Sequence, residues 1–401
     1  MLYDALRGVK VIDLSRILAG PWCTQNLADL GAQVIKIEHP ERGDDTRGWG
    51  PPNQSSADGQ IHMSAYFMAC NRGKQSVAID FANWQGAKLV RELVADADIL
   101  VENYKSGSLS KYGLDYAALS EINPRLVYLS ITGFGQTGPL AGRPGYDYVF
   151  QGMGGLMSYT GQPAGTPGAG PLRTGVAVVD LMTGMYATSA VLAALHQRDR
   201  TGRGMQLDIC LLDVAVALNA NQAANYLVSG HVPQRTGNAH PNCAPYEVFA
   251  CADGYFILAI GNDGQFGRFC TVLGHPEWSS DERYATNSAR LSNMQSLRPL
   301  ITGILAVESR RHWADMFDAA DVPWGPIHTL DEVFTHPQVQ HRQLLQIVHH
   351  PLLGDIKLVR NPLLAGTPPE ALATAPPLLG EHTAEVLAGC HSSTATQGAR
   401  P

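Results

Sequence analysis

Cysteine is sparse in this sequence, and its spacing excludes a disulfide framework. The seven cysteines among 401 residues are odd in number, scattered, and free of any Cys-x-x-Cys pair. That pattern is typical of reduced thiols in a cytosol, and it provides no zinc ligand set. Among the 14 histidines, His349 and His350 are adjacent, and neighbours on a strand point to opposite faces. We therefore predict no metal site.

Long apolar runs and strong charge are also missing. The start, MLYDALRGVK, lacks the apolar core of a signal peptide, and no apolar run reaches membrane-spanning length. Charged residues make up 16% of the chain and the net charge is −7, which argues against nucleic acid or a membrane as the main partner. The hydrophobic share of 45% allows a sizeable core. We expect a cytoplasmic protein.

The common nucleotide and hydrolase motifs are absent. Glu38 ends the second predicted strand, where a ribose-binding acid would lie, but the preceding turn, SRILAGPW, contains a single glycine. A dinucleotide fingerprint needs G-x-G-x-x-G there, so NAD binding is not predicted. The P-loop, the G-x-S-x-G elbow and H-E-x-x-H do not occur either.

What the sequence does contain is an alternation of strands and helices in its first third. The predicted strands are 9–14, 33–38, 76–81, 98–103 and 126–132, and the predicted helices are 22–30, 84–95 and 116–122. This alternation predicts an α/β fold with a Rossmann-like, mostly parallel sheet. Ligands of such sheets bind beyond the carboxyl ends of the strands.

The amino-acid composition and the kind of predicted elements change near residue 225, which predicts a second domain. Pro, Gly and polar residues crowd 230–245, followed by a strand pair at 246–251 and 255–260 and by helices at 266–273, 290–307 and 312–320. We expect a large domain over 1–220, a smaller α+β domain over 225–335, a return to the large domain over 340–390, and a flexible tail over 391–401.

A single acid precedes a long Ala-rich segment in the middle of the chain. The apolar run 176–179 ends in Asp180, and residues from there to Arg198 have helical spacing. The pattern predicts a carboxylate in the first turn of a long buried helix. Two interpretations stay open from the residues alone, a helix N-cap and a reactive carboxylate.

Basic residues occur after several predicted strands. They are Arg16, Arg72 and Lys74 with Asn71, Lys105 and Lys111 with Asn103 and Tyr104, and Arg143 with Tyr146. Together they would suit a ligand with several phosphates and a planar base. The alternative is that they are solvated surface residues.

Several stretches in order resemble the class III coenzyme A-transferases (the CaiB/BaiF type), the family of formyl-CoA:oxalate CoA-transferase and the carnitine CoA-transferases. They include VKVIDLSRILAGP, ACNRGKQSVAIDF, VENYKSGSL, GRPGYDYVFQGMGGLMS and GVAVVDLMTGMYA. The resemblance covers nearly the whole chain. It implies a transferase that moves coenzyme A from an acyl-CoA donor, such as succinyl-CoA, to a free carboxylic acid. It also implies an interlocked homodimer, and coenzyme A as a substrate with no tightly bound cofactor.

The resemblance also assigns residues. Asp180 falls on the catalytic aspartate, which would pass through a mixed anhydride and an aspartyl-CoA thioester. The positions matching coenzyme A contacts or their neighbours are Leu18, Ala19, His39, Asn71, Arg72, Lys74, Asn103, Lys105, Lys111 and Tyr146, beside Arg16, Tyr104 and Arg143. The long glycine loop of the oxalate enzyme corresponds to TGNAHPNCAP (236–245), where Gly237, Asn238 and His240 would face the acceptor acid. The alternative is that this loop is only a connector with solvated polar residues.

This sequence departs from the oxalate enzyme at Leu18, where that enzyme has Gln, and at His39, where it has Arg. Two alternatives to a transferase remain. An α-methylacyl-CoA racemase needs a His base where Tyr146 stands here, and tyrosine, with its ordinary pKa of about 10, is a poor base at neutral pH. A coenzyme A-binding protein without catalysis would not need Asp180.

Overall fold

The computed structural model describes residues 2–368 and 374–396, which divide into two compact units. Unit 1 consists of Met1–Leu156, Thr174–Ala223 and Phe334–Pro401. Unit 2 consists of Met157–Arg173 and Ala224–Val333. The segment 157–173, which the sequence placed in the large domain, thus groups with unit 2. Of the expected tail, 391–396 is helical and the remainder lies outside the described residues.

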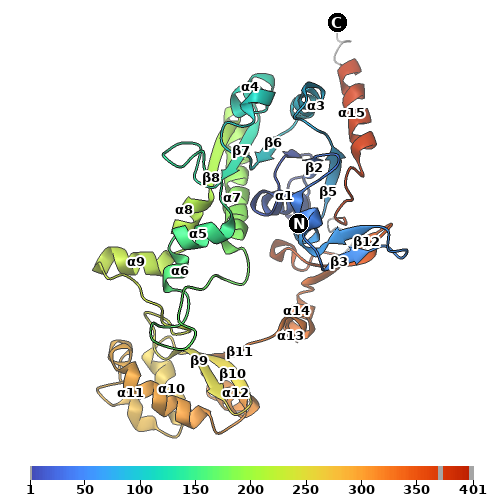
Figure 1. The fold of residues 1–401 in the computed structure, drawn as a ribbon. Coiled ribbons are helices and arrows are strands. Elements are labelled where there is room, and N and C mark those ends of the chain that lie inside the picture. Colours follow the sequence, from blue (N-terminus) through green and yellow to red (C-terminus); the bar gives the residue numbers. More distant parts are fainter. Residues whose placement is uncertain (1, 369–373, 397–401) are drawn as a thin grey trace. The chain divides into compact units, whose positions relative to one another are not determined.

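Unit 1 is built on a six-stranded sheet in which every neighbouring pair is parallel (Figure 1). The strand order is β5-β2-β1-β6-β7-β8. The strands are β1 (Lys10–Asp13), β2 (Gln33–Glu38), β5 (Lys74–Ala78), β6 (Ile99–Glu102), β7 (Val127–Thr132) and β8 (Met205–Cys210). This is the doubly wound order, and the direction of winding reverses between β1 and β6. The parallel α/β sheet predicted from the sequence is confirmed.

Helices and two small hairpins complete unit 1. The helices are α1 (Ala19–Asp29), α2 (Ala65–Cys70), α3 (Trp84–Val94), α4 (Tyr116–Ile122), α5 (Asp147–Met153), α7 (Val178–Thr201), α8 (Leu211–Ala217), α14 (Pro337–His341) and α15 (Thr383–Thr396). The hairpins pair β3 (Asn53–Ser55) with β4 (His62–Ser64), and β12 (Leu345–His350) with β13 (Gly354–Val359). Near the unit boundaries lie α6 (Leu156–Tyr159), α9 (Ala220–Ser229) and α13 (Leu330–Thr335).

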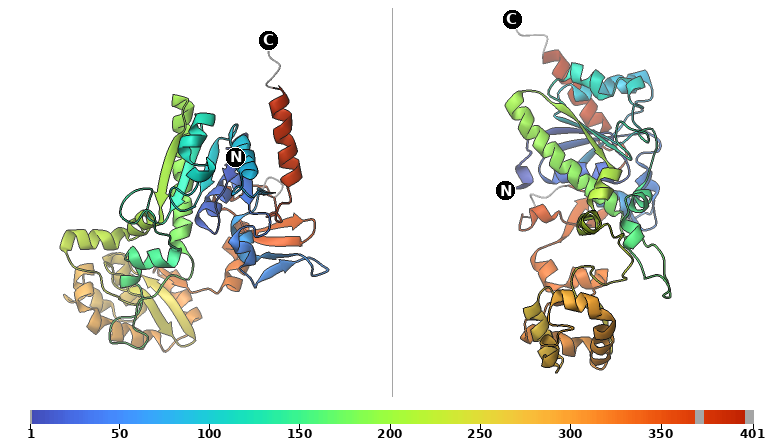
Figure 2. Two further views of the ribbon diagram at one scale, coloured as in Figure 1. Left: turned by 45° about the horizontal axis from the view of Figure 1, so that its top comes forward. Right: turned by 90° about the vertical axis from the view of Figure 1, so that its left-hand side faces the viewer.

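Alternate residues of the strands serve two separate cores, one on each face of the sheet. Val11 of β1 packs in a core with α1 and α7, whereas its neighbour Ile12 packs in another with α3 and α4. Successive side chains on a strand point to opposite faces, so strands covered on both faces are apolar throughout. Figure 2 shows the long light-green α7 lying along its face of the sheet.

Helix α7 is apolar and tightly packed. With 24 residues and a mean hydropathy of 1.5 over its best window, it is long and apolar enough to cross a membrane by length and composition, contrary to the expectation from the sequence. Its Val179, Ala187 and Val191 are nevertheless fully buried in the same core as α1, which is the packing of a core helix in a globular unit.

Gly184 sets how closely α7 approaches α1. A Cβ atom at this position would lie 2.8 Å from the carbonyl oxygen of Ala19 and 2.9 Å from the Cδ1 atom of Trp22. Backbone cannot yield as a flexible side chain can, so the two helices would have to separate. Because Ala19 is the first residue of α1, this close contact lies beside the start of that helix.

Unit 2 has its own sheet and its own core. The antiparallel strands β9 (Tyr246–Cys251), β10 (Gly254–Ala259) and β11 (Trp324–Pro326) form the sheet. Its helices are α10 (Asp263–Val272), α11 (Asn287–Leu305) and α12 (Arg310–Ala319). Phe256, Phe269 and Phe317 are fully buried at its centre. The smaller α+β fold therefore matches the composition change near 225.

We predict that Gly184→Ala lowers the free energy of unfolding by about 1–3 kcal/mol, the usual cost of overpacking a core. Gly303→Ala is the matched control, because a Cβ atom there meets nothing within 4 Å. That change in α11 is expected to raise stability by about 0.5–1 kcal/mol through helix propensity. Urea unfolding followed by circular dichroism measures both, and equal stability of Gly184→Ala and the parent chain would refute the packing argument.

Candidate active site

A cavity of about 680 Å³ lies in unit 1 at the carboxyl ends of β1, β2, β6 and β7. This volume is in the usual range for a small-molecule site. The loops that follow β1 and β6 both line it, so it lies at the point where the strand order reverses. The lining includes these predicted residues: Arg16, Leu18, Ala19, His39, Asn103, Tyr104, Lys105, Lys111, Arg143, Tyr146 and Asp180.

Three predicted residues are not brought into this cavity. Asn71, Arg72 and Lys74 are at most 4% exposed and are held by other protein groups. The Nζ atom of Lys74 donates to the Asn71 side chain at 2.9 Å and to the carbonyl of Pro21 at 3.0 Å. Arg72 forms an ion pair with Asp29. Their assignment as coenzyme A contacts is therefore withdrawn, because their polar atoms are already used within unit 1.

The lysines of β2 and β5 belong to a buried ionic cluster beneath the cavity. Lys74 pairs with Asp13 at 3.1 Å and Lys36 pairs with Asp44 at 2.9 Å, and all four side chains are fully buried. Burial acts to raise the pKa of Asp13, but Lys74 and Lys36 outweigh it and lower that pKa to about 2. Asp13 is therefore an anion that holds the ends of β1 and β5 together.

This cluster fixes the turn between β1 and α1. Ile17 has a φ of +72°, a left-handed conformation that is strained for a β-branched residue. The N–H of Ile17 donates to Asp44 Oδ1 at 3.2 Å. The carbonyl of Ser15, two residues earlier in the same turn, accepts from Lys36 Nζ at 2.7 Å. The buried charges thus hold a strained turn that lines the cavity.

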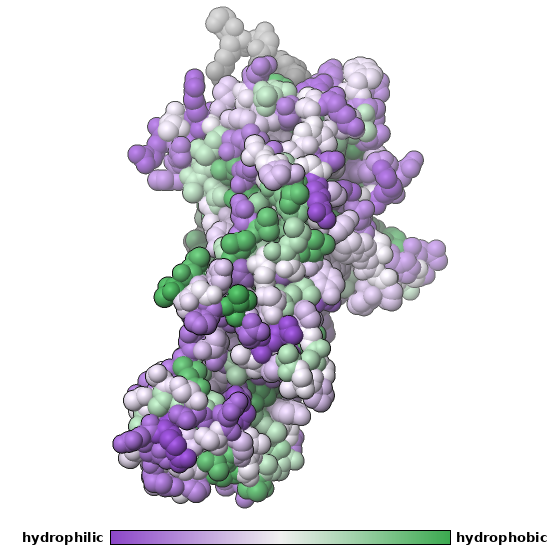
Figure 3. Space-filling model, turned by 60° about the vertical axis from the view of Figure 1, so that its left-hand side comes forward, coloured by the Kyte–Doolittle hydropathy of each residue, from purple (hydrophilic) through white to green (hydrophobic). Residues whose placement is uncertain are grey.

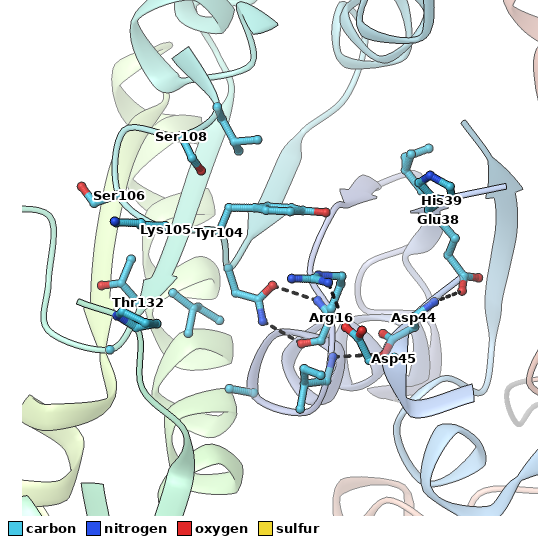
Figure 4. A pocket seen from close by; sticks show the side chains of 18 of the residues that line it. Arg16, Glu38, His39, Asp44, Asp45, Tyr104, Lys105, Ser106, Ser108 and Thr132 are labelled. Atoms are coloured by element: carbon cyan, nitrogen blue, oxygen red, sulfur yellow. Dashed lines mark hydrogen bonds and ion pairs between the residues drawn. The ribbon is translucent and has the colours of Figure 1, made fainter. Parts of the chain in front are cut away.

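Asn103 fastens the same turn from the side of β6. Its Oδ1 accepts from the Arg16 N–H at 2.9 Å, and its Nδ2 donates to the Arg16 carbonyl at 2.6 Å (Figure 4). The Arg16 side chain lies 5.2 Å from the centre of the Tyr104 ring and pairs with Asp45 at 2.8 Å. Asn103, predicted as a ligand contact, uses both of its amide atoms to join two loops.

The remaining lining is basic and aromatic. Figure 4 shows Lys105 and His39 on opposite sides of Arg16 and Tyr104. Phe81 contacts the rings of both Tyr104 and Tyr112 edge to face, at 5.6 and 5.8 Å between centroids. Sequence reasoning missed Phe81, Tyr112 and Arg42, all of which line the cavity. The available signals were the position of Phe81 at the end of a predicted strand and that of Tyr112 beside the predicted Lys111.

Asp180 is the third residue of α7, so the N-cap interpretation is wrong. The N-cap is Ala177, whose methyl side chain cannot accept a hydrogen bond. Instead, Asp147 Oδ1 accepts from the N–H groups of Val179 at 2.8 Å and Asp180 at 3.2 Å. The Asp180 carboxylate is left to line the cavity.

Burial and charge both act on the Asp180 carboxyl. Desolvation and, second, the negative charge of Asp147 raise its pKa from 3.8 to about 7. Two acids side by side with one strongly shifted are typical of functional sites. Tyr66 of α2 is coupled to the same pair: burial first, and then Asp180, raises the pKa of Tyr66 to about 12.

The loop 236–245 belongs to unit 2 and is organised by its own contacts. Gly237 has a φ of +67° and its N–H donates to the Gly161 carbonyl at 3.0 Å. His240 Nδ1 accepts from the Asn242 N–H at 3.0 Å, and its ring lies 5.1 Å from that of Tyr246. Asn238 is exposed. A role of this loop toward an acceptor acid stays a prediction.

Within residues 2–368 and 374–396, no group of three or more His, Cys, Asp or Glu side chains could hold a metal ion. The six cysteines that the structure describes are free thiols. The cavity itself places the Asp180 carboxylate among basic and aromatic side chains.

The raised pKa of Asp180 predicts a pH-dependent stability difference. Between pH 4 and 7 the unfolded chain loses the Asp180 proton that the folded chain keeps, so the wild type loses stability as pH rises, and the loss is complete above pH 7. Asp180→Asn lacks this penalty. It should be more stable than the wild type at pH 8 by about 1–3 kcal/mol, and by less at pH 5.

Thermal unfolding at both pH values measures the difference. Asp115→Asn, at the start of α4, is the control and should show no such trend. A difference that is equal at pH 5 and pH 8 would contradict the raised pKa.

The comparisons with known proteins identify the family of this chain. The family model described as CoA-transferase family III matches residues 6–383. The chain is 50% identical over 383 residues to a succinate–glutarate CoA-transferase of Agrobacterium fabrum, covering 96% of this chain and 95% of the relative. It is 42% identical to the human succinyl-CoA:glutarate CoA-transferase, covering 95% of this chain and 85% of that protein.

A solved structure supports the same assignment. The fold is similar to the crystal structure of a CAIB/BAIF family protein from Brucella suis, with a TM-score of 0.83, 47% identity, and coverage of 96% of this chain and 99% of that one. The resemblance noted in the sequence is confirmed across almost the entire chain. The chain belongs to CoA-transferase family III.

Proposed function

We propose that this chain transfers coenzyme A from succinyl-CoA to a short dicarboxylic acid such as glutarate, with Asp180 as the group that carries the acyl chain. The observation that carries the proposal is a carboxylate with a pKa of about 7 that opens into a cavity lined by basic and aromatic side chains. The names of the relatives supply the choice of succinyl-CoA and glutarate. They are named as CoA-transferases, which favours transfer over racemisation or mere binding.

The proposed reaction consists of four successive acyl transfers, and each of them passes through the Asp180 carboxyl group. The Asp180 carboxylate attacks the thioester carbonyl of the donor, giving a mixed anhydride and the coenzyme A thiolate. The thiolate attacks the Asp180 carbonyl, which releases succinate and leaves an aspartyl-CoA thioester. The acceptor carboxylate then attacks this thioester, which releases the thiolate and forms a second mixed anhydride with Asp180. The thiolate finally attacks the acceptor carbonyl of that anhydride, which gives the new acyl-CoA and frees the Asp180 carboxylate. Each step is a balanced acyl transfer, and covalent catalysis divides one hard exchange into easier ones.

The cavity supplies charge where an anionic ligand needs it. Lys105, Lys111 and Arg143 line it in a chain whose net charge is −7. These basic side chains would bind the phosphates of coenzyme A through charge-assisted hydrogen bonds. The aromatic rings around Phe81 would stack on its planar base. The side chains that share an ion pair, such as Lys36 with Asp44, hold the cavity wall and are not free for a ligand.

We also propose that two copies of this chain form a homodimer, interlocked as the family resemblance implies. The support is the apolar surface of unit 1. Met185 and Tyr186 on α7 and Val216 on α8 are 39%, 46% and 54% exposed, and Figure 3 shows hydrophobic residues gathered on part of one face. Exposed apolar groups of this kind are typical of association surfaces. The cytoplasmic location expected from the sequence stays a prediction.

Removing the Asp180 carboxylate is expected to abolish transfer without unfolding the chain. Asp180→Ala should lower the rate of succinyl-CoA:glutarate exchange by several orders of magnitude, as loss of a covalent nucleophile does, and should still bind coenzyme A. Asp199→Ala is the matched control, because that acid is 65% exposed at the far end of the same helix. Substantial transfer by Asp180→Ala, measured over a panel of acids, would disprove the assignment.

Lysines that line the cavity and lysines buried beneath it should respond differently to replacement. Lys111→Ala should weaken coenzyme A binding by about 1–3 kcal/mol, with a loss that shrinks at high salt, and should leave stability unchanged. Lys74→Ala should instead cost about 3–5 kcal/mol of stability, because it leaves Asp13 buried without its partner.

Calorimetry and thermal unfolding separate the two effects. The exposed Lys88 of α3 provides the control, since Lys88→Ala should change neither quantity. A stable Lys74→Ala that has lost only coenzyme A affinity would show that Lys74 meets the ligand after all.

A further inference from the structure

Two residues of α5 hold the start of the helix that carries Asp180. We propose that Asp147 and Gln151 are positioning residues, which fix the Asp180 carboxylate in the cavity by anchoring the backbone at the N-terminus of α7. The inference rests on the proposed role of Asp180 as nucleophile and extends it to residues outside the nucleophile itself. Asp147 and Gln151 lie one helical turn apart on the same helix.

Asp147 performs the capping that the sequence of α7 does not provide. Its Oδ1 accepts from the N–H groups of both Val179 and Asp180, at 2.8 and 3.2 Å. An acceptor at this place satisfies orphan donors and favours negative charge at the positive end of the helix. Because one of the two N–H groups belongs to Asp180 itself, the contact fixes the backbone of the nucleophile directly.

Gln151 connects Asp147 to the segment that leads into α7. Its Nε2 donates to Asp147 Oδ2 at 2.6 Å, and its Oε1 accepts from the Thr174 N–H at 2.9 Å. Gln151 is fully buried and Asp147 is 7% exposed. With its amide donating on one side and accepting on the other, Gln151 orients the Asp147 carboxylate and the incoming chain together.

Charge makes this arrangement costly, which argues for a role beyond stability. A Ser or Thr at position 177 would cap the helix locally without placing a second acid beside Asp180. Asp147 instead repels the Asp180 anion, and this repulsion disappears when Asp180 becomes a neutral anhydride or thioester. The carboxylate of Asp147 therefore disfavours the ionised ground state relative to the acylated one.

Few other groups face Asp180. Tyr66 of α2 is electrostatically coupled to Asp180 and to Asp147, and its raised pKa of about 12 keeps it neutral near pH 7. Arg16 of the β1–α1 turn and Tyr146 of the α5 N-cap line the same cavity. Arg16 is engaged with Asp45 at 2.8 Å. Of these neighbours, Asp147 is therefore the one whose removal should change the pKa of Asp180 most.

The test compares Asp147→Asn with Asp147→Ala. The asparagine keeps an oxygen for the two N–H groups and removes the charge, whereas the alanine removes both. For Asp147→Asn we expect the pKa of Asp180, followed by carboxyl ¹³C NMR and assigned with Asp180→Asn, to fall by about one unit. The acidic limb of kcat/KM should move to lower pH by the same amount.

For Asp147→Ala we expect kcat to fall about 100-fold, as displacement of a reacting group does, with KM for succinyl-CoA changed less than threefold. Asp147→Asn should retain at least ten times more activity than Asp147→Ala, because its oxygen still holds the helix start. Gln151→Leu should lower kcat in the same direction as Asp147→Ala. Asp115→Asn, at the start of α4, is the control and should leave the Asp180 titration and kcat unchanged.

An unchanged Asp180 titration in Asp147→Asn together with an unchanged kcat in folded Asp147→Ala would overturn the proposal. If Asp147→Ala does not fold, the NMR titration of Asp147→Asn alone tests the proposal, and an unchanged Asp180 titration in that variant would overturn it. Failure of the proposed function gives a different result: the wild type would then transfer coenzyme A to none of the acids, while the NMR titration would still report whether Asp147 acts on Asp180.

Discussion

The buried pairing of Asp13 with Lys74 and of Lys36 with Asp44 is the constraint on which unit 1 depends. These four side chains come from three adjacent strands and the loop after β2, and each is fully buried. Charges in such a place are tolerated only when each has its partner and hydrogen bonds. The cluster therefore fixes the ends of β1, β2 and β5 relative to one another. It also holds the strained turn at Ile17, which is part of the cavity wall.

A second constraint acts at the other wall, where α7 begins. Gly184 lets α7 lie against the start of α1, and Asp147 fixes its first N–H groups. One contact is steric and the other is a hydrogen bond, but both determine where the Asp180 carboxylate lies. A carboxylate at a helix start that is held on two sides has little freedom to move, which is what the proposed reaction, with attack both by and on one carboxyl group, would require.

The two sides of the cavity differ in charge: one carries the acidic pair Asp180 and Asp147, and the other carries basic side chains. On one side, burial and, second, the charge of Asp147 raise the pKa of Asp180 to about 7. The loops after β6 and β7 contribute Lys105, Lys111 and Arg143, in a protein that is acidic as a whole. Local pairing decides which basic residues remain open to a ligand, because Lys36 and Lys74 are used inside the protein. Net charge alone could not have separated these groups.

The sequence by itself determined the parallel α/β sheet and the presence of a smaller domain, whereas the role of Asp180 stays a prediction. Periodicity is local, so β2 (Gln33–Glu38) and α4 (Tyr116–Ile122) follow from their residues with the same bounds. The edge strand β8 was missed because its residues alternate between partly buried and exposed and only residues 202–204 separate them from the end of α7. A resemblance in ordered motifs identified the family, since it compares residue types and needs no geometry.

Only the tertiary structure decided which polar residues face the cavity. Lys74 and Lys111 both stand beside predicted strands, yet one is sealed beneath the sheet end and the other lines the cavity. Asp147 and Asp180 are 33 residues apart in the chain, and their contact arises only when α5 packs against the start of α7. Burial and pairing depend on which neighbours the fold supplies, so the pKa of Asp180 and the positioning of its backbone are properties of packing and not of the local sequence.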